Sequence, residues 1–110
     1  MVAETIDIVV VDVKAVARGF RVSSLLDSEV YNEDDEDIGT LEDLVIDQDR
    51  PEKVSFAILD VGGFLGLGAR RVAVEFNALT LRDGSGEVKI ILPGANKKIL
   101  EKLPELTKAS

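Results

Sequence analysis

The sequence predicts a small, mainly β domain, and three observations support this. Short runs rich in β-branched residues recur along the chain, separated by polar or glycine-containing turns. One apolar segment near the C-terminus, 97–103, has the spacing and flanking residues of a helix instead. The length of 110 residues suits one domain, and no apolar run approaches the ~18 residues of a membrane span. We therefore expect a single domain over 1–110, with no linker, second domain or internal repeat.

The centre of the chain is a glycine-rich segment, 60–68, between two strand-like runs. Its four glycines permit positive φ angles or a close approach of backbones that side chains would forbid. We expect three apolar residues within it to fold back onto the core: Phe64, Leu65 and Leu67. The preceding run, 53–61, has no polar face and predicts a central strand, while 70–76 alternates and predicts a half-buried one. Together these runs predict an antiparallel hairpin.

The N-terminal part predicts an additional strand. Residues Ile6 to Lys14 are dense in valine and isoleucine, which are typical of strands. We expect Gly19 to break or bulge this strand, with Phe20 and Val22 continuing it. Segment 23–27 then predicts a single helical turn capped by serine, which directs Leu25 and Leu26 to the core.

The next elements surround an acidic turn. Residues 29–32 predict a short strand, 33–37 a solvated acidic turn, and 38–47 a longer strand. The apolar residues of the longer strand do not all fall on alternate positions, as one face of a regular strand requires. This shift between odd and even positions predicts a bulge near Gly39 or at Glu42–Asp43. Residues 48–52 form a polar turn, where Pro51 cannot donate to a strand ladder.

The C-terminal part predicts a second hairpin and a helix. Residues 77–81 and 87–92 predict short strands joined by Asp83–Gly86, since Asp-Gly favours tight turns. Asn96 is placed to cap a helix from Lys97 to Leu103, which Pro104 ends. Its predicted apolar stripe consists of Ile99, Leu100 and Leu103. Six or seven short strands with close turns indicate a small barrel or sandwich.

The charge is negative and unevenly distributed. The net charge is −8, and every charged residue from Asp27 to Asp49 is acidic. The C-terminal region is basic instead, with Lys97, Lys98, Lys102 and Lys108. This balance argues against direct contact with nucleic acid, which requires lysine and arginine against phosphates. The acidic stretch is interpreted either as a solubilising edge or as a surface for a basic partner, including a second copy bound head to tail.

The chain contains no cysteine and no histidine. Thiol nucleophiles, metal sites built on those residues and histidine-based acid–base chemistry are thereby excluded. Segment 1–5 is too short for a signal peptide. The compartment stays open: a cytoplasmic location is favoured, and a periplasmic one would require prior removal of an N-terminal signal.

Motifs for chemistry are incomplete throughout. Gly63, Gly66 and Gly68 have the dinucleotide-fingerprint spacing in reverse and lack a following helix pattern. A calcium-loop spacing places Asn32, Asp34, Glu36 and Asp43 at ligand positions, but the required glycine is Asp37. Whether the stretch Glu33–Asp37 binds cations weakly stays open.

No catalytic residues are predicted either. Three serines lack a histidine base and so cannot form a serine triad: Ser23, Ser24 and Ser55. Three scattered aromatic residues are interpreted as core rather than as a base-stacking platform: Phe20, Tyr31 and Phe64. We therefore assign no catalytic, cofactor-binding or metal-binding residue and expect no cofactor.

Several segments taken together resemble the PRC-barrel family, which is named for the cytoplasmic domain of the photosynthetic reaction-centre H subunit. The resemblance covers Phe20 to about Pro104 and is most specific in the run Val-Gly-Gly-Phe-Leu-Gly-Leu-Gly. It also rests on shorter stretches: Ser23–Leu26, Val30–Asn32, Ile38–Asp47 and Val72–Val74. Glu75–Phe76 stands where the family often has proline, and the strand predicted at 6–14 lies outside the usual core.

The resemblance implies a strongly bent, six-stranded antiparallel β-barrel of the free-standing bacterial type, without catalysis. The expected organisation is an N-terminal strand extension (1–19), the barrel (20–92) and a C-terminal helix (96–104). The expected function is a non-enzymatic protein-interaction or assembly module, first of all a homodimer. Three alternatives remain: an accessory factor of a membrane electron-transfer complex, a factor in ribosome or RNA metabolism, and a small-ligand or divalent-cation binder. The family's glycines transfer only as structural positions.

Overall fold

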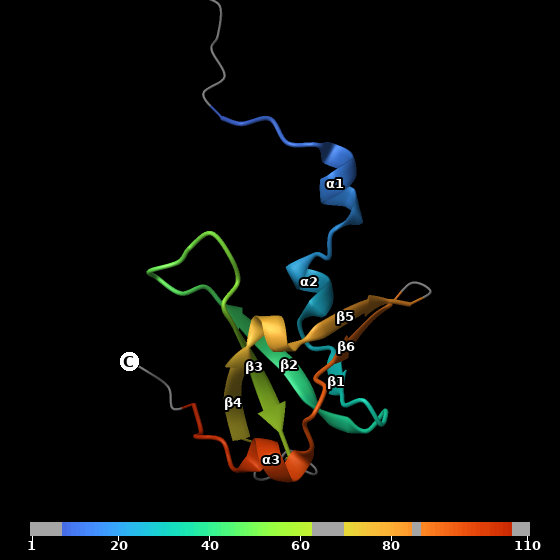
Figure 1. Ribbon diagram of the computed structural model, residues 1–110, viewed down its shortest axis with the longest axis vertical. Coiled ribbons are helices and arrows are strands. Elements are labelled where there is room, and N and C mark those ends of the chain that lie inside the picture. The colour runs from blue at the N-terminus through green and yellow to red at the C-terminus, as the bar shows by residue number, and fades with distance from the viewer. Residues whose placement is uncertain (1–7, 63–69, 85–86, 107–110) are drawn as a thin grey trace, which may run out of the picture.

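The computed structural model describes residues 8–62, 70–84 and 87–106, which form one six-stranded sheet and short helices (Figure 1). The strand order in the sheet is β4-β3-β2-β1-β6-β5. The strands are β1 (Glu29–Tyr31), β2 (Asp37–Val45), β3 (Phe56–Val61), β4 (Arg70–Glu75), β5 (Thr80–Asp83) and β6 (Val88–Ile91). The helices are α1 (Val13–Arg18), α2 (Val22–Leu25), the 3₁₀ helix η2 (Phe76–Ala78) and α3 (Lys97–Glu101).

Strands β2, β3 and β4 form an antiparallel meander, of which the sequence predicts the β3–β4 hairpin. The register of β2 against β3 shifts between Leu41 and Asp43, which confirms the predicted bulge at Glu42–Asp43. β3 pairs with β2 on one side and with β4 on the other, so it is an internal strand as expected. Its side chains alternate strictly between the two faces, and the buried row is Ala57, Leu59 and Val61.

The hydrophobic core lies on one side of this sheet. Strand β1 contributes Val30, β2 contributes Ile38 and Leu41, and β6 contributes Ile90. Two helical residues complete it, Leu25 from α2 and Leu100 from α3. Asn96 caps α3 as predicted, because its side chain accepts a hydrogen bond from the Ile99 backbone N–H at 2.8 Å.

One glycine in β2 is required by a close approach of two backbones. A Cβ atom at Gly39 would lie 2.6 Å from the Asp60 carbonyl oxygen of β3. Real Cβ atoms do not approach backbone oxygens so closely, hence only glycine allows this spacing of β2 and β3.

The expected closed, wholly antiparallel barrel is wrong on two points. The sheet remains open among the described residues, with β4 and β5 at its two edges. In addition, β1 pairs with β6 in parallel, with Val30 opposite Ile90 and Tyr31 opposite Ile91. The C-terminal segment lies against β4, where the Leu106 N–H donates to the Arg71 carbonyl at 2.7 Å. This contact occupies part of the edge that closure onto β5 would use.

The predicted N-terminal strand is also wrong over the described residues. From Ile8 to Asp12 the chain is irregular, and α1 begins at Val13 with the Asp12 side chain as its cap. Every residue from Ile8 to Ser24 is exposed, and α1 buries none of its side chains. Residues rich in strand propensity form a strand only against a pairing partner, and this segment has none among the described residues.

Several smaller predictions are corrected. Gly19 ends α1 rather than bulging a strand, and Phe20 is exposed rather than part of the core. α2 begins after Arg21 without a capping side chain, so serine does not cap it. α3 ends at Glu101 rather than at Leu103, and Ile99 is 47% exposed, so Leu100 is the inward residue of the helix and Leu103 packs on the core from beyond its end. The strand expected to begin at residue 77 begins at Thr80, after η2.

Both predicted hairpins are confirmed, although their turns are described only in part. β3 pairs with β4 and β5 pairs with β6, each antiparallel. Gly62 has a φ of +76°, as a glycine-dependent bend requires. The remaining glycine-rich residues, including Phe64, Leu65 and Leu67, lie outside the described residues, as do Ser85 and Gly86.

Gly39→Ala tests the close approach of β2 and β3. The new methyl group must push β3 away, so we expect a loss of about 2 kcal/mol or more in the free energy of unfolding. Urea denaturation followed by circular dichroism measures it. The neighbouring Thr40→Ala is the control and should lose about 1 kcal/mol or less; equal losses for the two variants would contradict the explanation.

Candidate functional site

The acidic turn that the sequence singles out is organised around Asn32, the one buried polar residue among those described. Its side-chain oxygen accepts hydrogen bonds from the backbone N–H groups of Asp34 and Glu36, each at 3.0 Å. Its Nδ2 donates to the Glu36 carboxylate at 3.0 Å and to the Ala95 carbonyl at 3.1 Å. Asn32 therefore joins the turn to the segment before α3, 63 residues away.

The geometry of the Asn32 turn differs from that of a calcium-binding loop. A calcium loop directs the oxygen of its first ligand to a common centre, whereas the Asn32 oxygen is occupied by two backbone N–H groups. Asp43 lies in β2 beyond the bulge, and its carboxylate accepts from the Leu44 backbone N–H at 2.8 Å. Among the described residues no three carboxylates are grouped so that they could hold a metal ion.

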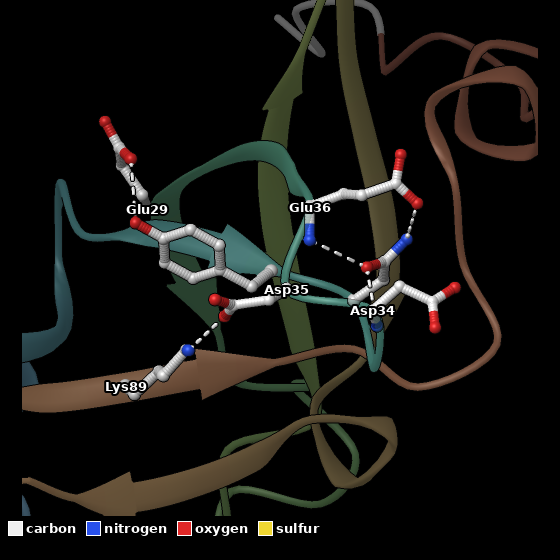
Figure 2. A network of polar contacts seen from close by, with 7 residues as sticks. Glu29, Asp34, Asp35, Glu36 and Lys89 are labelled. Atoms are coloured by element: carbon white, nitrogen blue, oxygen red, sulfur yellow. Dashed lines mark hydrogen bonds and ion pairs between the residues drawn. The ribbon is translucent and has the colours of Figure 1, made fainter.

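The other side of the turn contacts β6 through Lys89. Its ammonium forms an ion pair with Asp35 and lies 4.9 Å from the centre of the Tyr31 ring. Figure 2 shows Lys89 reaching from its strand toward Asp35, with Glu29 on the far side of the ring. The Tyr31 hydroxyl donates to the Glu29 carboxylate at 3.1 Å. One lysine thus links a cation–π contact and an ion pair between strands distant in sequence.

These residues line an open groove of about 800 Å³ between α2, β1 and the β5–β6 hairpin. Its walls include Ser24, Ser28 and Glu87, together with four residues of the network drawn in Figure 2: Glu29, Tyr31, Asp35 and Lys89. The Ser28 hydroxyl lies 3.3 Å from the Ser24 carbonyl and donates to it. Among the described residues no hydrogen bond joins either serine hydroxyl to a base, so neither serine is arranged as an activated nucleophile.

Two carboxyl pairs lie on the sheet. A hydrogen bond with the Asp37 carboxyl raises the pKa of Glu29 above its ordinary value of 4.5, although the Tyr31 hydroxyl opposes this. The same hydroxyl contact raises the pKa of Tyr31. Sharing a proton relieves the repulsion of two adjacent carboxylates.

The second pair joins the β2 bulge to β3. A hydrogen bond with Asp60, followed by burial, raises the pKa of Glu42, while Arg71 acts in the opposite direction. The Arg71 Nε lies 2.9 Å from Glu42 Oε2 and 3.9 Å from Asp60 Oδ1. The shorter contact is an ion pair without the alignment of a hydrogen bond, because Glu42 Oε2 has no hydrogen-bond partner. Two carboxylates therefore share one arginine.

The sequence pointed to the acidic turn but not to its organisation. Asn followed by Asp two residues later is the signature of a turn held by its own side chain, and this signal could have identified the role of Asn32. The contact of Tyr31 with Lys89 carries no local signal, because the residues come from different hairpins. The sequence predicts a strand over Ile6 to Lys14, and the exposure of its described part, 8–14, emerges only from the structure.

The comparison with known families concerns the region that forms the sheet. The family model of the PRC-barrel domain matches residues 17–97, more than half of the chain. The chain belongs to the PRC-barrel family. Its PRC-barrel domain thus includes the whole sheet, the acidic turn and the groove, whereas residues 8–16 precede the match. No curated protein matches the chain. None of the helices formed by the described residues is long and apolar enough to cross a bilayer.

Asn32→Ala should destabilise the PRC-barrel domain by about 2–3 kcal/mol, because it leaves the Ala95 carbonyl and two turn N–H groups without their partner. Urea denaturation measures the loss. The control is Asn77→Ala, an exposed residue of η2, which should change stability by about 0.5 kcal/mol or less. An Asn32 variant as stable as this control would contradict the structural role.

The carboxyl pairs predict a pH dependence. Glu29 and Glu42 bind their protons more tightly in the folded chain. Their contribution to stability is therefore present below the ordinary pKa of 4.5 and lost as the pH rises through the raised values. The free energy of unfolding of Glu29→Gln and of Glu42→Gln, each compared with wild type at the same pH, should therefore rise between pH 4 and pH 7. Urea denaturation at both pH values measures this difference. Glu52→Gln, in an exposed loop, is the control; a parallel pH profile for all three variants would refute the pairing.

Proposed function

We propose that the protein is a non-catalytic interaction module whose first partner is a second copy of itself. The contact is made by the segment 8–21, named here the N-terminal arm, which comprises the irregular residues 8–12, α1 and the residues up to α2. Six apolar side chains of the arm are 62–84% exposed, and this is the observation that carries the proposal: Ile8, Val9, Val10, Val11, Val13 and Val16.

Such exposure is costly in water. Burying one valine or isoleucine side chain fully is worth about 1.5–3 kcal/mol, so covering even part of the arm yields a large association energy. Isolated exposed apolar residues are common on protein surfaces, but a contiguous run marks an interaction surface. Figure 1 shows the arm extending away from the sheet, where a partner can reach it from several sides.

The absence of catalysis is part of the proposal. The sequence contains neither cysteine nor histidine, and the groove beside the acidic turn contains serines that donate to backbone or lack a base. The polar clusters hold strands together through Asn32 and Lys89. These features support a role in binding.

Val10→Asp tests the arm. A charge within the apolar contact is expected to convert a dimer into a monomer at tens of micromolar protein, because an unpaired carboxylate cannot be buried without a large desolvation cost. Size-exclusion chromatography with light scattering measures the mass. Ile99→Asp also places a carboxylate at an exposed apolar position, but in α3 and outside the arm; it is the control and should leave the dimer intact. A wild-type chain that is monomeric under these conditions would refute the proposal.

A further inference from the structure

The side of the meander away from the core is a second surface that no other described element covers. In β3 the buried row alternates with Phe56, Ile58 and Asp60. The strand register places Val45 and Asp43 of β2 beside this row on one side, and on the other Glu75, Ala73 and Arg71 of β4. Paired residues share a face of a sheet. We name these eight positions, together with Glu42 at the bulge, the outer sheet face.

This face has an apolar centre and an acidic rim. Phe56 is 38% exposed and Ala73 is exposed, while Val45 and Ile58 are half-buried. The face itself carries four carboxylates and one guanidinium: Glu42, Asp43, Asp60, Glu75 and Arg71. At its Phe56 end the neighbouring loop adds one carboxylate and two cations, Asp47, Arg50 and Lys53, which leaves the carboxylates in excess. Since Glu42 and Asp60 share the single arginine, the rim has an excess of negative charge that a further cation would neutralise.

The N-terminal arm has the complementary composition. Its apolar run is followed by Lys14, Arg18 and Arg21, with Asp12 as its only acidic residue, so its net charge is positive. Asp12 is engaged as the cap of α1. None of the three basic side chains forms an ion pair within the described part of the chain. An apolar segment with a basic flank matches an apolar surface with an acidic rim.

We propose that the N-terminal arm of one copy docks on the outer sheet face of a second copy, and that the exchange is reciprocal. This inference rests on the proposed self-association and assigns both of its surfaces. The arm carries the apolar side chains to Phe56 and Ile58, and its basic residues to Asp43 and Glu75 at the rim. A reciprocal exchange uses the same pair of surfaces twice, so it closes at two copies around a two-fold axis.

Two charge-reversed variants test the assignment. The arm variant carries Arg18→Glu and Arg21→Glu, and the face variant carries Asp43→Lys and Glu75→Lys. In each variant homodimer, both arm–face contacts then bring like charges together. We expect its dissociation constant to rise at least about tenfold. In an equimolar mixture both contacts of the heterodimer are attractive, so mixing should restore the dimer. Sedimentation equilibrium of each variant and of the mixture measures this, with circular dichroism to confirm that each is folded.

The controls separate the two proposals. Glu52→Lys introduces the same change of charge in an exposed loop outside both surfaces and should leave the dissociation constant unchanged. Phe56→Asp should weaken the wild-type dimer at least about tenfold, since it places a charge at the apolar centre. A dimer that requires the arm but tolerates both face changes would overturn this inference alone. A mixture that stays monomeric would also overturn it. That result is expected if each arm instead folds onto the sheet of its own copy, because mixing the two variants then creates no new attractive contact. A monomeric wild type would overturn both proposals.

Discussion

The rest of the structure depends on the two-sided pairing of β3. Because this strand has neighbours along its whole length, its alternation fixes two surfaces at once. Ala57, Leu59 and Val61 enter the core, and the intervening side chains form the surface that faces away from it. The close spacing at Gly39 and the bulge beside it set the register of β2 against this strand. A slip of one residue would exchange a buried leucine for a carboxylate, so core and outer surface are determined together.

The sequence predicted the parts of the fold that local pattern determines. The β3–β4 hairpin, the bulge, the C-terminal hairpin and the Asn96 cap each depend on residues close together in the chain, where alternation, turn residues and capping side chains act. The edges of the sheet were not predictable in this way. The edge strand β4 is contacted by Leu106, about 35 residues further along the chain, and the parallel pairing of β1 with β6 joins segments about sixty residues apart. The strand predicted for the N-terminal segment was wrong for a related reason. Its valines favour a strand, but no described part of the chain pairs with it.

The candidate site shows the same division. The acidic composition of the turn was evident, yet composition could not distinguish a cation loop from a turn that uses its own asparagine. The structure supports the second, because the Asn32 oxygen faces backbone N–H groups. Membership of the PRC-barrel family accounts for the sheet and the turn, whereas most of the apolar arm precedes the matched region. The arm is therefore where this chain adds to its family domain.

The parallel contact of β1 with β6 has a consequence for synthesis on the ribosome. The meander is complete once β4 has emerged, but the free side of β1 must wait for a strand encoded near the end of the chain. Until β6 has emerged, Val30 is not fully buried and the backbone groups on the β6 side of β1 have no strand partner. During this period β1 is held in the sheet only by its pairing with β2. Distant pairings of this kind slow folding and lengthen the period in which strand edges are accessible to other chains. The emergence of β6 is thus the late step that commits the whole sheet to its native order.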